Sequence, residues 1–171
     1  MSLDIHPAKP SDASNLAALS IQVWLHTYAK AGVRDALSRY VLAEFTEARL
    51  FNEIADETRR IFICEVDGCL VGYAKIAFNA RCPVRNISQP EVATLYVQEN
   101  FHRRGIGSLL LDAAMVDCQS NGYSELWLLV NHENVGARRF YEDKSFKKIG
   151  SFDFQLENER HPNDVLMREL S

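Results

Sequence analysis

The sequence has no apolar run long enough to cross a membrane and nothing typical of an export signal. No stretch approaches the roughly 20 consecutive apolar residues that a transmembrane helix needs. The opening residues, Met1-Ser2-Leu3-Asp4, lack the basic segment and apolar core of a secretory signal. We therefore expect a cytoplasmic protein with no membrane partner.

Paired cysteines and histidine–cysteine clusters are also missing. The four cysteines stand at positions 64, 69, 82 and 118, with no C-x-x-C pair. This spacing suggests neither a zinc site nor a disulfide framework, and reduced thiols that pack inside the protein are the simpler interpretation. Because no histidine and cysteine set has ligand spacing, we expect no metal.

The chain has no excess of positive charge. Its net charge is −4, whereas a general nucleic-acid binder is usually basic, so we expect no nucleic-acid partner. A negative charge is compatible with a small cationic substrate, although long-range charge steers a ligand without identifying it.

What is present is the composition of an ordinary globular protein. Hydrophobic residues make up 47% of the chain and charged residues 25%. A length of 171 residues fits one domain, because two domains would each be unusually small. We expect residues 1–171 to form a single domain.

The first half predicts helices followed by an antiparallel hairpin. A short strand fits residues 3–6, and Ser11 or Asp12 is a candidate N-cap for a helix that runs to about residue 28. A second helical region lies within 35–56, where Thr46 as a new N-cap would divide it in two. Strands at 60–66 and 70–78 are joined by Asp67-Gly68, a strong hairpin signal, and a loop follows to residue 90.

The second half predicts a strand–helix–strand unit. Residues 92–97 and 126–130 are short apolar runs typical of buried strands, and the helix between them begins after Gly105. A crossover helix requires the two strands to be parallel. A further helix begins near Asn134, and two more strands follow it. The fold class is therefore α/β: a mixed, mostly antiparallel sheet with a central parallel pair and helices on both faces.

The most informative segment is the turn from Phe101 to Ser108, which contains two arginines and two glycines. The N-terminus of a helix leaves amide groups unpaired and favours an anion, and glycine lets a phosphate approach the backbone. The turn is therefore a candidate pyrophosphate site. An ordinary tight turn with solvated arginines is the alternative.

Two other nucleotide-binding motifs do not fit this turn. A dinucleotide fold needs G-x-G-x-x-G directly after a strand, but Leu110 occupies the third glycine position and a polar link, 98–104, intervenes. The P-loop pattern G-x-x-x-x-G-K-[ST] is absent.

Three motifs in order resemble the GCN5-related N-acetyltransferase (GNAT) family. They are Leu95-Tyr96-Val97, Arg103-Arg104-Gly105-Ile106-Gly107 and Asn134-x-x-Ala137-x-x-Phe140-Tyr141. The match covers about 91–147, and the order of a helical section and a hairpin before it also fits. The chain departs from the family pattern at His102, where Gln or Arg is usual, and at Ser145, where Gly is usual.

The resemblance implies an enzyme that uses acetyl-CoA as co-substrate. In such a fold, strand 92–97 splays from strand 126–130, and pantetheine pairs with main-chain groups of the segment Leu95-Tyr96-Val97. The pyrophosphate would lie on the amides of Arg103, Arg104, Gly105, Ile106, Gly107 and Ser108. Asn134 would contact the pantetheine arm, or it would simply cap its own helix.

The resemblance also supplies candidate catalytic groups. Tyr141 is the candidate general acid, since a phenol could protonate the departing thiolate, and a packed tyrosine is the alternative. An alkyl ammonium with a pKa of about 10 must lose a proton before it can attack. Glu91 is the candidate base, with a solvated strand-end charge as its alternative.

The acceptor is less well defined than the cofactor. Residues 23–28, followed by Tyr40 and Phe45, and the ending 165–170 resemble bacterial acetyltransferases related to polyamine (spermidine/spermine) acetylation. Aromatic residues at helical spacing can equally be core.

The candidate acceptor-side residues are His26, Tyr28 and His161, with packing or surface roles as the alternative. The competing functions are acetylation of a protein or peptide amine and acyl-CoA binding without catalysis. The sequence leaves a homodimer open.

Overall fold

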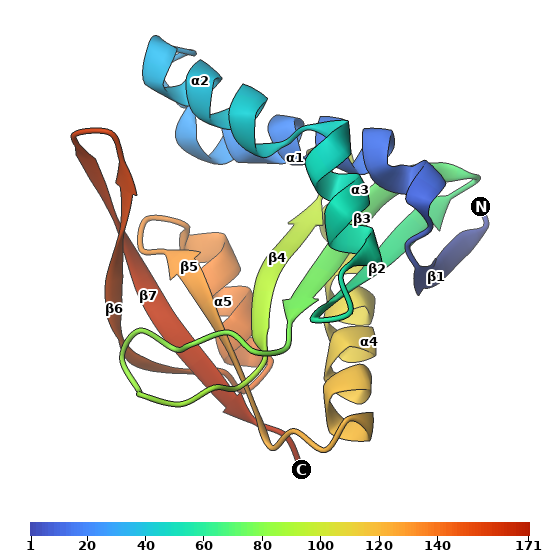
Figure 1. The fold of residues 1–171 in the computed structure, drawn as a ribbon, viewed down its shortest axis with the longest axis vertical. Helices are drawn as coiled ribbons and strands as arrows, with labels where there is room; N and C mark the ends of the chain where they lie inside the picture. Colours follow the sequence, from blue (N-terminus) through green and yellow to red (C-terminus); the bar gives the residue numbers. More distant parts are fainter. The chain divides into compact units, whose positions relative to one another are not determined.

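The computed structural model describes all of residues 1–171. The chain forms seven strands, five α-helices and two short 3₁₀ helices. Figure 1 shows how they are arranged. In chain order these are β1 (Leu3–Pro7), η1 (Pro10–Asp12), α1 (Ala13–Tyr28), α2 (Asp35–Glu44), α3 (Glu47–Ala55), β2 (Arg59–Val66), β3 (Cys69–Ala77), β4 (Glu91–Val97), η2 (Glu99–Phe101), α4 (Ile106–Ser120), β5 (Glu125–Asn131), α5 (Val135–Asp143), β6 (Lys147–Leu156) and β7 (Glu159–Glu169).

The strands form one mixed sheet in the order β1-β2-β3-β4-β5-β7-β6. β4 and β5 are parallel, with Glu91 opposite Trp127, whereas β1 with β2, β5 with β7 and β6 with β7 are antiparallel. The structure therefore confirms the predicted mixed sheet and its parallel pair.

The chain divides into two compact units. The first comprises residues 1–76 and 94–114, and the second comprises 77–93 and 115–171. The boundary falls within β4 and within α4, so each of these elements contributes to both units. The expectation of a single domain stays a prediction.

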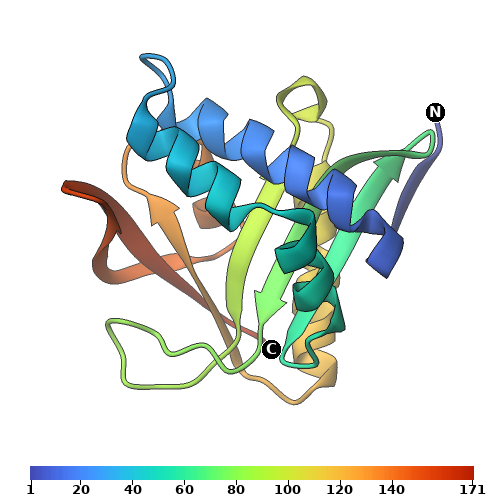
Figure 2. The ribbon, with the colours of Figure 1, turned by 45° about the horizontal axis from the view of Figure 1, so that its top comes forward.

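In the first unit, helices cover both faces of the strands. On one face, α1 and α3 pack on Ile61, Ile63 and Tyr73. On the other, the start of α4 packs through Ile106 and Leu110 on a second apolar cluster of β2 and β3 (Figure 2). The predicted two-faced covering is thus present in this unit, because alternate residues of β2 point to opposite faces.

In the second unit, the loop 79–90 covers one face of β5 and β7. Cys82 of this loop packs with Trp127, Val165 and Met167. A Cβ at Gly150 on β6 would lie only 2.7 Å from a methyl carbon of Val84, so this glycine allows the loop to pack closely. The segment predicted to be a loop is therefore ordered by its own buried cluster.

Several local predictions are confirmed. Asp67 and Gly68 both have positive φ, 50° and 79°, as a tight hairpin turn requires. The side chain of Thr46 accepts a hydrogen bond from the amide of Arg49 and caps α3, which separates α2 from α3. Asp12 is the N-cap position of α1, but its carboxylate accepts from the amide of Lys9 instead of capping the helix.

Two predictions of burial were wrong. In β4 only Val92 is buried, and residues 93–97 are partly exposed, whereas a buried strand was expected. Cys64, Cys82 and Cys118 are buried free thiols as expected, but Cys69 is exposed because it begins β3 directly after the hairpin turn.

None of the five α-helices combines the length and apolar character that a membrane crossing requires.

Candidate active site

The turn before α4 has the backbone geometry of an anion-binding helix start. Arg103 and Gly105 take positive φ values of 61° and 79°. The carbonyl of Gly105 accepts the first α-helical bond, from the amide of Leu109, so Gly105 is the N-cap position. The amides of Ile106, Gly107 and Ser108 therefore belong to the first turn, whose amides have no acceptor within the helix. Amides of this kind can bind an anion, and their binding of a pyrophosphate stays a prediction.

Side chains of the same turn contact β4 and η2. The Nε2 atom of His102 lies 2.7 Å from the carbonyl oxygen of Val97, so the ring donates a hydrogen bond to the end of β4. The guanidinium of Arg104 lies 4.9 Å from the centre of the Phe101 ring. Arg103 and Arg104 are both exposed. His102, where the family usually has Gln or Arg, thus connects the turn to β4 through a hydrogen bond.

Gly72 on β3 allows a close approach to the Leu95-Tyr96-Val97 segment. A Cβ at this position would lie 2.8 Å from the carbonyl oxygen of Tyr96 and 3.2 Å from a methyl carbon of Val97. Any larger residue would push β4 away. A lone glycine inside a strand pattern is a known signal for close backbone approach, and sequence reasoning missed it here.

In the second unit, Tyr141 lies in α5 with its ring buried between two phenylalanines. Its ring centre is 5.1 Å from that of Phe140 and 5.7 Å from that of Phe146, both with edge-on geometry. Burial raises the pKa of the Tyr141 hydroxyl well above its ordinary value. The phenol therefore keeps its proton at neutral pH and can act as a donor.

The end of α5 explains the departure at Ser145. Ser145 has a φ of 66°, and the amide of Phe146 donates to the carbonyl of Tyr141, five residues back. This is the bond of a Schellman helix end, which is completed by the apolar contact of Tyr141 with Phe146. Glycine is the residue that this left-handed position favours.

Replacing Ser145 with glycine should therefore raise the free energy of unfolding. A non-glycine residue in the left-handed region costs roughly 1–2 kcal/mol in the folded protein. Glycine removes this cost, but its greater flexibility also stabilises the unfolded chain, so we expect a net gain of about 0.5–1 kcal/mol. Urea unfolding measures it. Ser145→Ala is the control and should give no gain, and equal stability of the two variants would contradict the explanation.

Asn134 is the N-cap of α5. Its side-chain oxygen accepts from the amide of Ala137 at 3.1 Å, so the capping alternative is what the structure shows. The cap uses only the oxygen of the side chain, and the amide nitrogen is a further donor. A contact of Asn134 with pantetheine stays a prediction.

Glu91 opens β4 in the second unit and is partly buried. It stands opposite Trp127 in the parallel pair, and the neighbouring Pro90 accepts a hydrogen bond from the backbone amide of Trp127. The indole of Trp127 also donates to the carbonyl of Gln89 at 2.9 Å. These bonds fix the backbone immediately before Glu91, while its role as a base stays a prediction.

The candidate acceptor residues fall in different places. Tyr28 stacks at 4.5 Å on Trp24, which also stacks on Tyr40 at 4.7 Å. His26, between Trp24 and Tyr28 in the sequence of α1, contacts Glu99 of η2, with Nδ1 and Oε2 separated by 3.5 Å. The first unit therefore brings His26 beside the segment that leads into the glycine turn.

His161 lies in the second unit, on β7. Its Nε2 atom is 3.2 Å from a carboxylate oxygen of Glu159, and its ring faces Phe154 of β6. The structure places it on the β6–β7 hairpin, in the unit that also contains Tyr141 and Glu91.

Comparisons with known proteins agree with this geometry. The model of the Acetyltransferase (GNAT) family matches residues 25–146. The chain belongs to the GNAT family of acetyltransferases. It is 30% identical over 161 residues to an uncharacterized N-acetyltransferase of Mycobacterium tuberculosis, covering 94% of this chain and 99% of the relative. A second relative, an uncharacterized N-acetyltransferase of Lactobacillus delbrueckii subsp. lactis, is 24% identical over 160 residues, which cover 93% of this chain and 92% of the relative.

Solved structures share the fold of this GNAT protein. The PaiA N-acetyltransferase of Thermoplasma acidophilum, determined with coenzyme A, aligns with a TM-score of 0.81 at 20% identity over 99% of both chains. A GCN5-related N-acetyltransferase of Rhodopseudomonas palustris aligns with a TM-score of 0.76 at 17% identity, covering 99% of this chain and 97% of the other. The GNAT protein described here is thus an N-acetyltransferase that depends on acetyl-CoA.

A buried carboxylate anchors α5 of this acetyltransferase. Asp164 on β7, whose side chain is 3% exposed, has three partners whose nitrogen atoms lie at 3.0 Å: the cations of Arg138 on α5 and Lys148, and the imidazole of His132. Burial opposes ionisation of Asp164, but hydrogen bonds from Lys148 and His132 outweigh it and lower the pKa of the carboxyl. Asp164 thereby ties the helix that carries Asn134 and Tyr141 to the strand β7.

Replacing Asp164 with asparagine should destabilise this GNAT protein. Loss of charged hydrogen bonds at a buried group should cost about 2–3 kcal/mol in the free energy of unfolding at pH 7. Because the pKa is lowered on folding, the contribution is present above the unfolded value of about 4 and is lost as pH falls through the native value. Urea unfolding at pH 7 and in acid should show the difference between the two proteins shrinking.

The control for this experiment is Asp153→Asn. Asp153 is exposed and lies 3.9 Å from Arg160, so its loss should cost less than about 1 kcal/mol. Equal destabilisation by the two substitutions, or no pH dependence for Asp164→Asn, would contradict the anchoring role.

Proposed function

We propose that this protein transfers the acetyl group of acetyl-CoA to the primary amine of a small polyamine. The amine attacks the thioester directly while both substrates are bound, so no acetyl group is held on the protein. The observation that carries the proposal is the amide-rich start of α4, which follows a turn with positive φ at Arg103 and Gly105.

The glycine turn supplies the binding groups for the cofactor. The first-turn amides of Ile106, Gly107 and Ser108 receive the pyrophosphate, and the helix dipole adds to the attraction. The exposed Arg103 and Arg104 contribute positive charge. In this proposal the backbone of Leu95 and Val97 pairs with pantetheine, beside Tyr96, and Asn134 donates from its amide nitrogen.

Tyr141 and Glu91 carry the proton transfers. Glu91 accepts a proton from the ammonium form of the acceptor, directly or through water, which creates the nucleophilic lone pair. Tyr141 donates its proton to the sulfur as the carbon–sulfur bond breaks, so that coenzyme A leaves as a neutral thiol, and the second proton lost by the attacking nitrogen then returns to the phenolate. The phenol holds its proton at neutral pH, as a proton donor must, while the raised pKa makes it a weaker acid than a solvated tyrosine.

The first unit offers features suited to a cationic acceptor. Tyr28 presents an aromatic ring in the cluster with Trp24 and Tyr40, and aromatic faces attract alkyl ammonium groups. Burial, with Glu44 nearby, raises the pKa of Tyr40 to about 12, so this ring stays neutral. His26 and Glu99 add a polar pair on the same unit, and His161 is proposed as a further contact.

A thiol-release assay against polyamines, amino acids, aminoglycosides and peptides tests the acceptor. We expect the highest kcat/KM with a polyamine and a rise in KM for that acceptor, at constant KM for acetyl-CoA, in the variants His26→Ala and Tyr28→Ala. A preference for peptides would replace the small amine with a protein acceptor. Absence of turnover with every amine would overturn the proposed acceptor class.

The chemistry proposed here involves no metal. Every proton transfer is assigned to a side chain, and the thioester needs no further activation. We therefore expect turnover to be unchanged, within about twofold, after dialysis against EDTA. Activity lost in EDTA and restored by zinc would contradict this expectation.

The proposal also includes the location, domain organisation and oligomeric state of the enzyme. We propose a cytoplasmic protein that folds as a single domain and associates as a homodimer. Sedimentation velocity should give twice the chain mass of 19.4 kDa, and a monomer over the micromolar range would exclude the dimer.

A further inference from the structure

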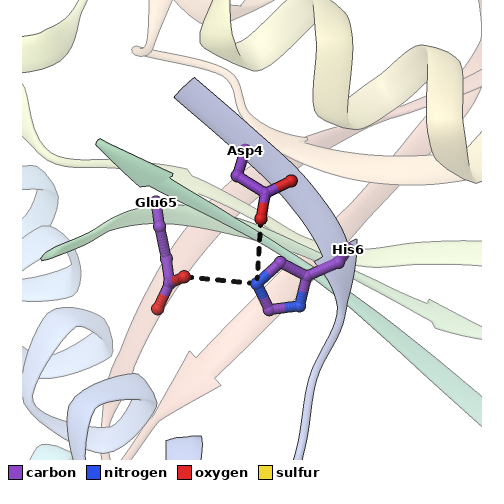
Figure 3. A group of neighbouring side chains, drawn as sticks. All are labelled: Asp4, His6 and Glu65. Carbon is purple, nitrogen blue, oxygen red and sulfur yellow. Dashed lines mark hydrogen bonds and ion pairs between the residues drawn. The ribbon is translucent and has the colours of Figure 1, made fainter. Parts of the chain in front are cut away.

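Three side chains at the edge of the first unit converge on one point. Asp4 and His6 lie on β1, and Glu65 lies on β2 (Figure 3). Asp4 stands directly opposite Glu65 in the antiparallel pair, and His6 follows two residues later on the same face. The three donor atoms lie within 4.8 Å of one another. Backbone pairing therefore fixes the spacing of the cluster.

One of the three separations already matches that within a metal coordination shell, and the other two are longer. Nε2 of His6 is 3.2 Å from Oε2 of Glu65 and 3.8 Å from Oδ2 of Asp4. Tetrahedral coordination with bonds of about 2.0–2.1 Å separates neighbouring ligand atoms by about 3.3 Å. A small rotation of Asp4, whose side chain is 68% exposed, brings the third donor to this spacing.

The orientation of the His6 ring is set from outside the cluster. Its Nδ1 atom lies 3.0 Å from the carbonyl oxygen of Pro7, and a carbonyl can only accept, so Nδ1 carries a hydrogen. Nε2 is therefore the ring atom that faces both carboxylates. Histidine ligands of metals usually have this arrangement, with the second nitrogen donating to a carbonyl or carboxylate.

Charge and exposure also suit a cation. The hydrogen bonds to the Pro7 carbonyl and to Glu65 raise the pKa of His6, so an ion that binds Nε2 displaces a proton from the ring. The cluster then carries two negative charges, which balance a divalent ion. His6 and Glu65 are partly buried, at 26% and 28% side-chain exposure, while Asp4 leaves the site open to solvent. An ion could enter from the Asp4 side and keep water ligands there.

We propose that Asp4, His6 and Glu65 bind a divalent transition-metal ion, with Zn²⁺ as the best match. Imidazole favours Zn²⁺ over Mg²⁺ and Ca²⁺, which prefer oxygen ligands alone, and two carboxylates with water complete a zinc shell. The ion links the terminal strand β1 to β2. Glu65 lies on the same face of β2 as Ile61 and Ile63, whereas Ile106 of the cofactor turn packs with Cys64 and Val66 on the opposite face. The site is therefore distinct from the cofactor turn and serves stability.

Isothermal titration of the tag-free protein with Zn²⁺ tests the site. We expect one ion per chain, and an affinity at least about tenfold weaker in His6→Ala and in Glu65→Gln. Hydrogen exchange of the β1 amides should slow when Zn²⁺ is added to the unaltered protein and stay unchanged in both variants. Mg²⁺ at the same concentration should give no heat. Circular dichroism checks that each variant is folded, and Glu65→Gln keeps a hydrogen-bonding side chain if His6→Ala proves unstable.

Two controls separate this cluster from other zinc ligands. His161→Ala removes a histidine at the same 3.2 Å from a glutamate, but in a pair that forms no three-donor group, and should leave zinc affinity unchanged. Cys69→Ser removes the exposed thiol and should likewise have no effect. Loss of binding in either control, full binding in His6→Ala and Glu65→Gln, or no binding to the unaltered protein would overturn the proposal.

Discussion

Replacing Tyr141 with phenylalanine should lower kcat by about 10²–10⁴, the usual contribution of a general acid. The substitution keeps the ring and its contacts with Phe140 and Phe146, so the fold should be retained. Affinity for acetyl-CoA should change only a few fold, because the lost proton matters when the sulfur departs. A fall in kcat and kcat/KM together would mark an interaction made chiefly in the transition state.

The matched control is Tyr123→Phe. Tyr123 belongs to the same unit and stacks on Phe78 at 5.6 Å, but it has no proposed part in the chemistry. It should leave kcat unchanged. Near-normal turnover of Tyr141→Phe, with chemistry shown to limit the rate, would leave water or another residue as the acid. A large loss of acetyl-CoA affinity alone would instead make Tyr141 a binding residue.

Replacing Gly107 with glutamate should weaken acetyl-CoA binding by at least about 100-fold, since it places a negative charge where the helix start receives the pyrophosphate. An acidic residue in the first turn stabilises a helix by about 0.3–1 kcal/mol, so the protein should stay folded. Calorimetric titration with acetyl-CoA measures the loss. Gly105→Glu should have the same effect on binding, but the φ of 79° at Gly105 adds backbone strain.

Gly107→Ala separates charge from bulk. It adds a Cβ without a charge, and alanine favours the helix, so its acetyl-CoA affinity should fall much less than that of Gly107→Glu. If folded Gly107→Glu binds acetyl-CoA as the unaltered protein does, the turn is not the pyrophosphate site.

Features that depend on short-range signals were predictable from the sequence. The Asp67-Gly68 hairpin, the cap at Thr46 and the helix after Gly105 each follow from residues within a few positions of one another. The parallel pairing of β4 with β5 followed from the crossover helix between them. Such features need no knowledge of which distant strands pair.

Features that depend on strand register were missed. Asp164 contacts Lys148 because β7 pairs with β6, and it contacts Arg138 because α5 reaches β7 at this position. The sequence alone does not reveal either contact. Asp4 and Glu65 come together for the same reason, since β1 pairs with β2 across some sixty intervening residues. The partial exposure of residues 93–97 was missed because an apolar run predicts burial without regard to which neighbours cover it.

The burial of one tryptophan in each compact unit gives this protein two intrinsic fluorescent reporters. Trp24, 4% exposed, lies on α1 in the first unit, and Trp127, 3% exposed, lies on β5 in the second. Their environments differ, because Trp24 stacks on tyrosines whereas the Trp127 indole is hydrogen-bonded to a carbonyl. Emission from Trp24→Phe reports the second unit alone, and emission from Trp127→Phe reports the first. Denaturation midpoints that coincide in the two variants would mean that the units unfold as one cooperative domain.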